Sequence, residues 1–288
     1  MPPRLALAVD IGGTKLAAGI VDGEGGRLLD RAATPTPVTD DADVVFSALT
    51  GLLDKLLPVE AAVCGIGCGG PMAPGGEEVS TLHIPAFRRF PLRRRVAEAT
   101  GLATFVDNDA KALARGEGWV GAAAGRSDFI AMVVSTGVGG GIFLDGRLLD
   151  GRAGNAGHIG HVVVVPGGRE CFCGGRGCLE AEASGRAIAA ATGRPPVEAD
   201  PEVIERTGTL VGRAVASVAN LLDLPLAVVA GSVALGFGPP FFAAAQAEID
   251  ALARLDFSRG TRIVPAGLGD AGPLIGAAAV GFAGLASS

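Results

Sequence analysis

Four side chains that could bind a metal lie close together in the second half of the chain. They follow the spacing H-x9-C-x-C-x4-C and are His161, Cys171, Cys173 and Cys178. Three of the five cysteines in the chain belong to this cluster. One imidazole and three thiolates are typical of a structural zinc ion in tetrahedral coordination. We therefore predict a structural Zn²⁺ site, and the alternative is a chance cluster of buried thiols.

Two glycine-rich turns could bind phosphate groups. The first is DIGGT at residues 10–14, followed by Lys15, and the second is STGVGGG at residues 135–141. Glycines let backbone N–H groups approach a phosphate, and neighbouring hydroxyl and amine groups add donors. Asp10 could hold Mg²⁺ through water. Each turn alone could be a plain hairpin, but together they predict a polyphosphate clamp that is neither a P-loop nor a Rossmann motif.

An acidic cluster, VDNDA at residues 106–110, lies at a predicted junction of a strand and a helix. One of its polar side chains could cap the helix, but capping does not explain the whole cluster. A hydroxyl group that attacks a phosphoryl group needs a base to accept its proton. We predict that Asp109 is this base and that Asn108 holds neighbouring sugar hydroxyls.

The elements that must position these residues alternate between strands and helices, which indicates an α/β fold. In the first half, the predicted order is a strand at 4–10, a strand at 16–23, a helix at 42–57, a strand entering a loop at 61–72, a helix from near Pro91, and a strand, turn and helix at 103–118. The second half is predicted to begin with a hairpin at 129–151 and a functional loop at 152–180. Helices follow from 184, then a strand with a glycine loop at 226–236, and a strand, loop and closing helix at 261–285.

The two glycine turns belong to segments that look like one structural unit used twice. Residues 7–30 and 129–151 both contain an apolar strand, a Gly/Thr turn, a second apolar strand, a DG pair and then RLLD. Two unrelated hairpins with a shared glycine bias are the alternative. The joint match of turn and outgoing strand favours a duplication.

Composition excludes some classes of function. The net charge of −6 disfavours a nucleic-acid partner. No uninterrupted apolar stretch approaches the ~18 residues of a spanning helix, and Asp10 follows the N-terminus too soon for a signal peptide. We therefore expect a cytoplasmic protein without a membrane partner. The arginines at 88–95 are predicted to be a solvated helix face, Cys64 and Cys68 to pack in the core, and His83 to be a loop residue.

Several motifs together resemble the ROK family of sugar kinases. They are DIGGTK, VDNDA, GNAGHIGH at 154–161, CFCGGRGCLE at 171–180 and AGSVALG at 230–236. The resemblance implies an actin-like or hexokinase-like ATPase fold with two α/β domains around a central cleft. The expected domains are a small one at 1–111, a large one at 112–271, and a closing helix at 272–288 that packs back on the first domain.

The resemblance also implies roles for individual residues. Asp109 would be the general base, and the zinc ligands would be the four named above. The expected cofactors are ATP, Mg²⁺ and structural Zn²⁺; relatives that use polyphosphate as a rule lack the cysteine cluster, which favours ATP. The implied sugar-binding residues are Gly70, Asn108, Asp109, His158, His161 and Glu180. The implied nucleotide-binding residues are Asp10, Gly12, Gly13, Thr14, Lys15, Ser135, Thr136, Gly137, Gly139 and Gly231.

The expected reaction is phosphorylation of the 6-hydroxyl of a hexose, with glucose as the first substrate. Many family members have Glu where His158 stands, and an imidazole offers a hydrogen-bond donor that a carboxylate lacks. This difference leaves the exact sugar open, and the alternative to glucose is an amino or N-acetylamino hexose: kanosamine, glucosamine, N-acetylmannosamine or N-acetylglucosamine. A non-catalytic sugar sensor is a third hypothesis. The resemblance also favours a homo-oligomer, either a dimer or a tetramer.

Overall fold

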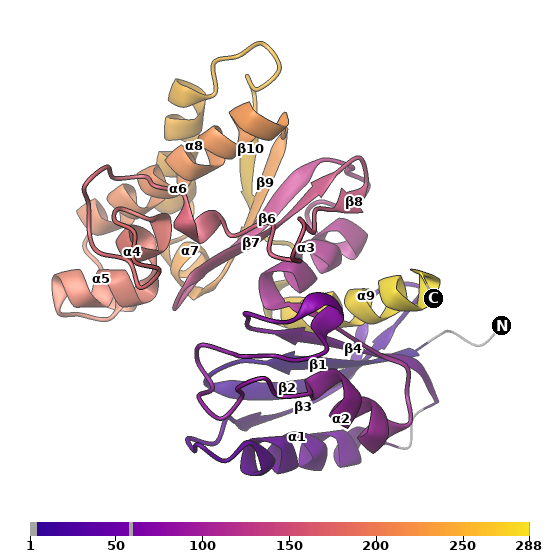
Figure 1. Cartoon of the computed structure of the whole chain (residues 1–288). Helices are drawn as coiled ribbons and strands as arrows, with labels where there is room; N and C mark the ends of the chain where they lie inside the picture. The colour runs from indigo at the N-terminus through magenta and orange to yellow at the C-terminus, as the bar shows by residue number, and fades with distance from the viewer. Residues whose placement is uncertain (1–4, 58–59, 288) are drawn as a thin grey trace. The chain divides into compact units, whose positions relative to one another are not determined.

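The computed structural model describes residues 5–57 and 60–287, which form two compact units. The first unit contains the described residues up to Gly121, residues 150–155 and the chain from Leu268, and the second contains Ala122–Leu149 and Ala156–Gly267. In Figure 1 the first unit is mainly indigo and yellow, and the second runs from magenta to orange. The first unit extends beyond the expected boundary at residue 111 because helix α3 (Asp109–Val120) packs against the C-terminal helix α9 (Gly272–Ser287).

The first unit is built on a five-stranded sheet in the order β3-β2-β1-β4-β5. Strands β1 to β3 form an antiparallel meander, and β4 and β5 run parallel to β1. The strands are β1 (Leu5–Ile11), β2 (Lys15–Asp22), β3 (Leu28–Pro35), β4 (Ala61–Cys68) and β5 (Thr104–Asn108). Residue 4 of the predicted first strand lies outside the described residues. β3 was not predicted, because its sequence, LLDRAATP, shows neither a continuous apolar run nor an alternating pattern, and most of its side chains are exposed.

Helices cover both faces of this sheet, as Figure 1 shows. Alternate side chains of β1 point to opposite faces. Leu7 and Val9 join one apolar cluster with α1 (Ala42–Leu56) and α2 (Leu92–Thr100), whereas Ala6 and Ala8 join a second cluster with α9. Short 3₁₀ turns lie at Pro74–Gly76 and Gly269–Ala271.

The C-terminal helix α9 lies directly on the central strand β4. A side chain at Gly65 would overlap the carbonyl oxygen of Ala277, so the strand and the helix approach at backbone distance. Among the described residues, Gly269–Ser287 is one helix that is long and apolar enough to span a membrane, with a mean hydropathy of 1.3. Half of it is buried against the sheet, so in this fold it is a core helix.

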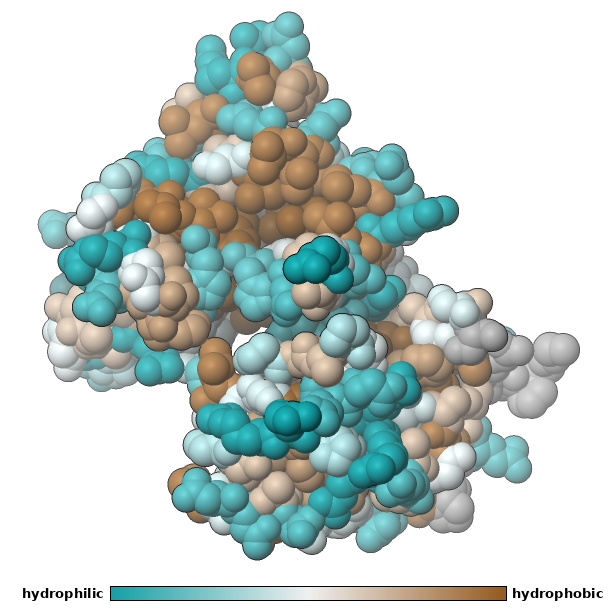
Figure 2. Space-filling model, viewed as in Figure 1, coloured by the Kyte–Doolittle hydropathy of each residue, from teal (hydrophilic) through white to brown (hydrophobic). Residues whose placement is uncertain are grey.

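The arginine-rich helix α2 is solvated, as the sequence indicates. Arg93 forms an ion pair with Glu77, and Arg95 pairs with Asp43 of α1. The region over α2 is largely teal in Figure 2, the colour of hydrophilic residues. These arginines therefore form a hydrated, charge-paired surface on the described part of this unit.

The second unit repeats the topology of the first. Its sheet has the order β10-β9-β6-β7-β8, in which β6 pairs antiparallel with β7 and parallel with β9. The hairpin β6–β7 thus occupies the same place as β1–β2, which agrees with the predicted duplication. The strands are β6 (Phe129–Val134), β7 (Val138–Leu144), β8 (Arg147–Leu148), β9 (Leu226–Ala230) and β10 (Arg262–Pro265).

The helices of the second unit enclose a single large apolar cluster with its sheet. They are α4 (Leu179–Ala183), α5 (Gly185–Thr192), α6 (Pro201–Leu222), α7 (Ser232–Phe237) and α8 (Pro239–Leu252), with 3₁₀ turns at Ile159–His161 and Pro196–Glu198. The predicted loop at 152–180 has little regular structure apart from the first of these 3₁₀ turns. The metal-ligand cluster of the sequence lies in this loop.

Candidate active site

Three parallel strands of the first unit bring polar residues to one edge of the sheet. Asp10 ends β1 beside Gly67 of β4, and Cys68 at the end of β4 lies beside Asn108 of β5. Because the carboxyl ends of parallel strands meet at the same edge, loops there form binding sites in open α/β sheets. Asp109 follows Asn108 directly, so the predicted base and the predicted magnesium-binding carboxylate lie at the same edge.

Asp10 and Asp109 lie close together: a Cβ at Gly67 would be 3.9 Å from Oδ1 of Asp10 and 3.8 Å from Cα of Asp109. Burial raises the pKa of Asp10 to about 7; the Asp109 carboxylate adds to this rise and Lys15 opposes it. Burial also raises the pKa of the Cys68 thiol well above its usual range, with further contributions from Asp109 and Asp10. A nearby cation would favour the ionised form of Asp10. The carboxylate at this edge therefore fits a hydrated Mg²⁺, the ion that the sequence predicts here.

The junction of β5 and α3 fixes the orientation of the acidic cluster. Asn108 caps α3, because its Oδ1 accepts a hydrogen bond from the N–H of Ala110 at 3.0 Å. The same N–H donates to Oδ1 of Asp109 at 2.8 Å, and the Asp109 side chain is exposed. The predicted sugar-binding Gly70 lies beside Asn108, since a Cβ at Gly70 would be 3.6 Å from its Nδ2. Capping explains Asn108, whereas the Asp109 side chain is exposed at the first residue of α3.

The first glycine turn projects from the same sheet between β1 and β2. Gly12 donates its N–H to the carbonyl of Lys15 at 3.0 Å, and Gly13, Thr14 and Lys15 are exposed. His83, which was predicted to be a loop residue, packs over this turn: a Cβ at Gly13 would be 2.5 Å from the Cβ of His83. No sequence signal indicated this contact, because the two residues belong to distant loops.

The second glycine turn joins β6 to β7 and lies beside the predicted adenosine loop. The hydroxyls of Ser135 and Ser232 are 2.9 Å apart, and Ser232 directly follows Gly231. Gly231 has φ 102°, and a side chain there would overlap the carbonyl oxygen of Val134. The two segments predicted to bind the nucleotide are therefore neighbours within the second unit. Thr136 is exposed at the turn, whereas Gly139 lies inside β7.

Glu180, a predicted sugar-binding residue, is attached to the second glycine turn. It lies in the first turn of α4, and its Oε2 accepts a hydrogen bond from the N–H of Val138 at 2.9 Å. A Cβ at Gly137 would be 3.1 Å from this oxygen. The carboxylate therefore links the turn to the segment that follows the last cysteine of the metal-ligand cluster.

The predicted zinc ligands come together in the second unit. One ligand atom from each of His161, Cys171, Cys173 and Cys178 lies within 4.8 Å of all the others. The sulfurs of Cys173 and Cys178 are 3.8 Å apart, and Nδ1 of His161 is 3.7 Å from the sulfur of Cys171. A tetrahedral site with Zn–S bonds of about 2.3 Å requires sulfurs about 3.8 Å apart. The donor set and its spacing therefore fit Zn²⁺.

The two histidines of this region differ in their surroundings. His161 is partly buried and directs Nδ1 towards the cysteines, while His158 precedes the 3₁₀ turn and is exposed. Their ring centroids are 6.0 Å apart. His161, the predicted metal ligand, and His158, a predicted sugar-binding residue, are thus adjacent. Glu180 follows the metal-ligand cluster in the same unit.

The ROK family model matches residues 6–282. The chain belongs to the ROK family. It is 37% identical to the N-acetylmannosamine kinase of Escherichia fergusonii and 38% identical to that of Citrobacter koseri, each over 248 residues that cover 81% of this chain and 84% of the relative.

Two solved structures have the same fold. The ROK hexokinase of Thermus thermophilus is 32% identical with a TM-score of 0.82, and the match covers 99% of this chain and 100% of the other. A ROK family glucokinase of Streptomyces griseus in complex with glucose and AMPPNP is 30% identical with a TM-score of 0.83, over 97% and 99% of the two chains. The predicted family and hexokinase-like α/β fold are confirmed.

We expect the purified protein to contain about one Zn²⁺ per chain. Cys173→Ser should lower both the metal content and the melting temperature, because metal binding is coupled to the folding of such loops. Cys64→Ser, which changes a buried thiol outside the cluster, should leave the metal content unchanged. Elemental analysis of fresh, active protein that finds no zinc would contradict the assignment.

Proposed function

We propose that this chain is an ATP-dependent sugar kinase that phosphorylates the 6-hydroxyl of an N-acetylamino hexose, with N-acetylmannosamine as the first candidate. One observation carries the kinase assignment: the exposed carboxylate of Asp109 lies at the same sheet edge as Asp10, which directly precedes the first glycine turn. Glucose was the substrate expected first from the sequence. The relatives at 37–38% identity are N-acetylmannosamine kinases and favour the alternative.

Asp109 acts as the general base in this proposal. The oxygen of the sugar 6-hydroxyl attacks the γ-phosphorus of ATP, its proton passes to the Asp109 carboxylate, and the bond to the bridging β–γ oxygen breaks to release ADP. The N–H of Ala110 holds one carboxylate oxygen of Asp109. Mg²⁺, which Asp10 would hold through water, supplies charge neutralisation for the phosphates.

The second unit supplies the remaining contacts. The exposed backbone and hydroxyl groups of the turn at 135–139, with Gly231, bind the nucleotide. Nδ1 of His161 faces the cysteines and would bind the zinc ion, which would leave Nε2 for a sugar hydroxyl. Glu180 accepts hydrogen bonds from hydroxyls near C1 and C2. A bound metal would therefore orient a sugar-binding imidazole and would take no part in phosphoryl transfer.

His158 is the residue that we expect to determine which sugar is preferred. It is exposed and adjacent to His161. A neutral imidazole donates one hydrogen bond and accepts another, so it can serve the carbonyl oxygen of an N-acetyl group, which a carboxylate cannot. This property fits the carbonyl oxygen of an N-acetyl group as well as sugar hydroxyls, so the choice of an N-acetylamino hexose rests on the N-acetylmannosamine kinase relatives.

Glucose is the second candidate substrate. The similar glucokinase structure from Streptomyces griseus, which holds glucose and AMPPNP, favours it. A sensor without catalysis is disfavoured by the presence of Asp109, both glycine turns and Glu180. The two sugars share the reacting 6-hydroxyl and differ at C2, so the mechanism is the same for both.

The substrate assignment is tested by an assay of ADP release over a panel of hexoses. We expect kcat/KM for N-acetylmannosamine to exceed that for glucose by at least about tenfold, because a site that hydrogen-bonds a substrate group rejects an analogue without it. A higher value for glucose would instead establish the second candidate. Absence of ADP release with every hexose would end the kinase proposal.

Asp109→Asn should reduce kcat by ~10²–10⁴-fold, since an amide cannot accept the hydroxyl proton. Sugar affinity measured by calorimetry should persist, because the amide keeps the size of the side chain. The matched control is Asp54→Asn, the same chemical change on the exposed face of α1, and it should retain full activity. An Asp109→Asn variant that kept more than about a tenth of the wild-type kcat would contradict the base role, because removal of a general base lowers the rate by more than that.

A further inference from the structure

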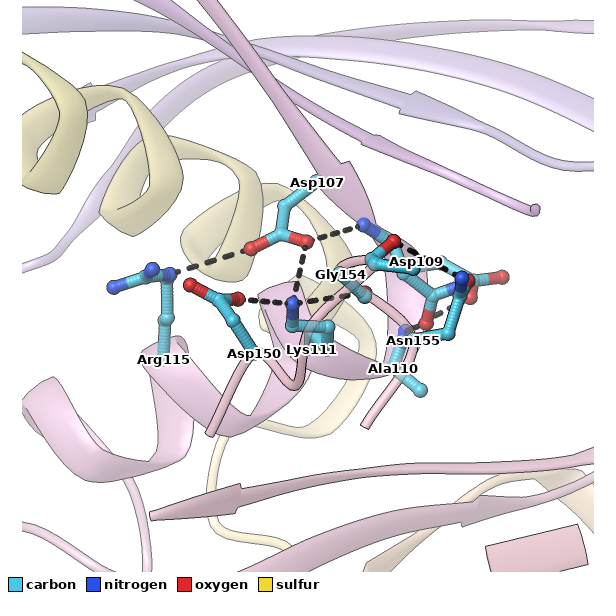
Figure 3. Close-up of polar contacts among 10 residues, drawn as sticks. Asp107, Asp109, Ala110, Lys111, Arg115, Asp150, Gly154 and Asn155 are labelled. Carbon is cyan, nitrogen blue, oxygen red and sulfur yellow. Dashed lines mark hydrogen bonds and ion pairs between the residues drawn. The ribbon is translucent and has the colours of Figure 1, made fainter. Parts of the chain in front are cut away.

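A buried lysine lies two residues after the proposed base. Lys111 is only 3% exposed, although it carries a charge. It is one of three lysines in the chain. Its ammonium group forms ion pairs with Asp150 and, at 3.4 Å, with Asp107, and it donates to the carbonyl oxygen of Gly154 at 3.3 Å. Figure 3 shows these three acceptors converging on Nζ. The phosphoryl-transfer step described above does not use this group.

Asp107 connects this lysine to the start of α3. One of its oxygens accepts the N–H of Asn108 at 2.8 Å, and the other faces Arg115 at 3.7 Å. The Asp107 side chain is only 16% exposed. A buried ammonium or carboxylate is costly unless it is paired and hydrogen-bonded. The network therefore pairs these buried charges, and the Lys111 ammonium group is directed at Asp150 and Gly154.

Residues 150–155 are a short segment that belongs to the first unit, although the chain on either side of it belongs to the second. The chain before them, Ala122–Leu149, and after them, Ala156–Gly267, belongs to the second unit. Residues 150–153 and 155 are exposed, so little apolar burial holds the segment in place. Lys111 contacts it near both ends, at Asp150 and at Gly154. The segment leads within three residues to His158, where the proposed sugar-reading region begins.

We propose that Lys111 is a positioning residue that fastens residues 150–155 to the helix that begins with Asp109, and so fixes the start of the chain that carries His158 and His161. The inference rests on the proposed kinase function and adds a determinant of sugar affinity. Lys111 acts through Asp150 and Gly154 and does not touch the reacting atoms.

The kinetic test is Lys111→Met, which keeps the length of the side chain and removes its charge. We expect KM for the preferred hexose to rise about 10- to 100-fold, because a small misplacement of substrate-binding groups has effects of this size. KM for ATP should stay within about twofold of wild type, because the glycine turns that would bind the nucleotide lie outside the segment that Lys111 holds. Lys55→Met, on the exposed face of α1, is the matched control and should have wild-type kinetics.

Asp150→Asn tests the same contact from its exposed end, and it leaves Lys111 paired with Asp107 and the carbonyl oxygen of Gly154. The Asp150 side chain is 64% exposed, so this variant should fold. It should raise the hexose KM in the same direction, and the double variant should be no worse than the more severe single one, because both remove a shared interaction. Independent, multiplicative effects of the two substitutions would contradict the proposal.

Hydrogen exchange gives a readout that does not depend on activity. Backbone amides of residues 150–155 should exchange faster in Lys111→Met and Asp150→Asn than in the wild type and Lys55→Met. Unchanged exchange there, or a lower melting temperature with unchanged hexose KM, would overturn the positioning role. If the wild-type protein phosphorylates no hexose, the proposed function fails, while the exchange data still decide whether Lys111 fastens this segment.

Discussion

The first unit must hold two carboxylates, those of Asp10 and Asp109, close together at one end of its sheet. Burial and mutual repulsion disfavour two negative charges at one sheet edge, and the pKa of Asp10 rises to about 7 as a result. The parallel pairing of β1, β4 and β5 forces this proximity. The tight packing of α9 against Gly65 keeps β4 between the other two strands.

The second unit contains a long loop that must be ordered without helices or strands. Residues 156–178 have little regular structure, and four metal ligands gather within them. Ile159 and Val164 anchor the first part of this loop in the apolar core, and a bound Zn²⁺ would order the part that carries the cysteines. The hydrogen bond between Glu180 and Val138 extends this order to the second glycine turn. The metal-ligand cluster and the glycine turn are thus parts of one ordered surface in this unit.

Local sequence patterns predicted a large part of this architecture. Apolar strands followed by glycine turns indicated both hairpins, and the spacing of His161 and the three cysteines indicated their cluster, because each of these features is encoded in a short segment. Contacts between distant segments could not be predicted in this way. Lys111 meets Asp150 across 39 residues, and His83 meets Gly13 through the packing of two loops. The sugar that the relatives favour was also placed second, because one side chain such as His158 changes the donors offered without changing the fold.

The central claim is most directly tested by the titration of Asp10, followed by carboxyl ¹³C NMR without nucleotide or Mg²⁺, with Asp10→Asn used to assign the resonance. The account predicts a pKa of about 7 in the wild-type protein. It also predicts a lower pKa in Asp109→Asn, because that variant removes the neighbouring negative charge. A wild-type pKa near the ordinary value of 3.8 that Asp109→Asn does not change would contradict the coupling of the two carboxylates.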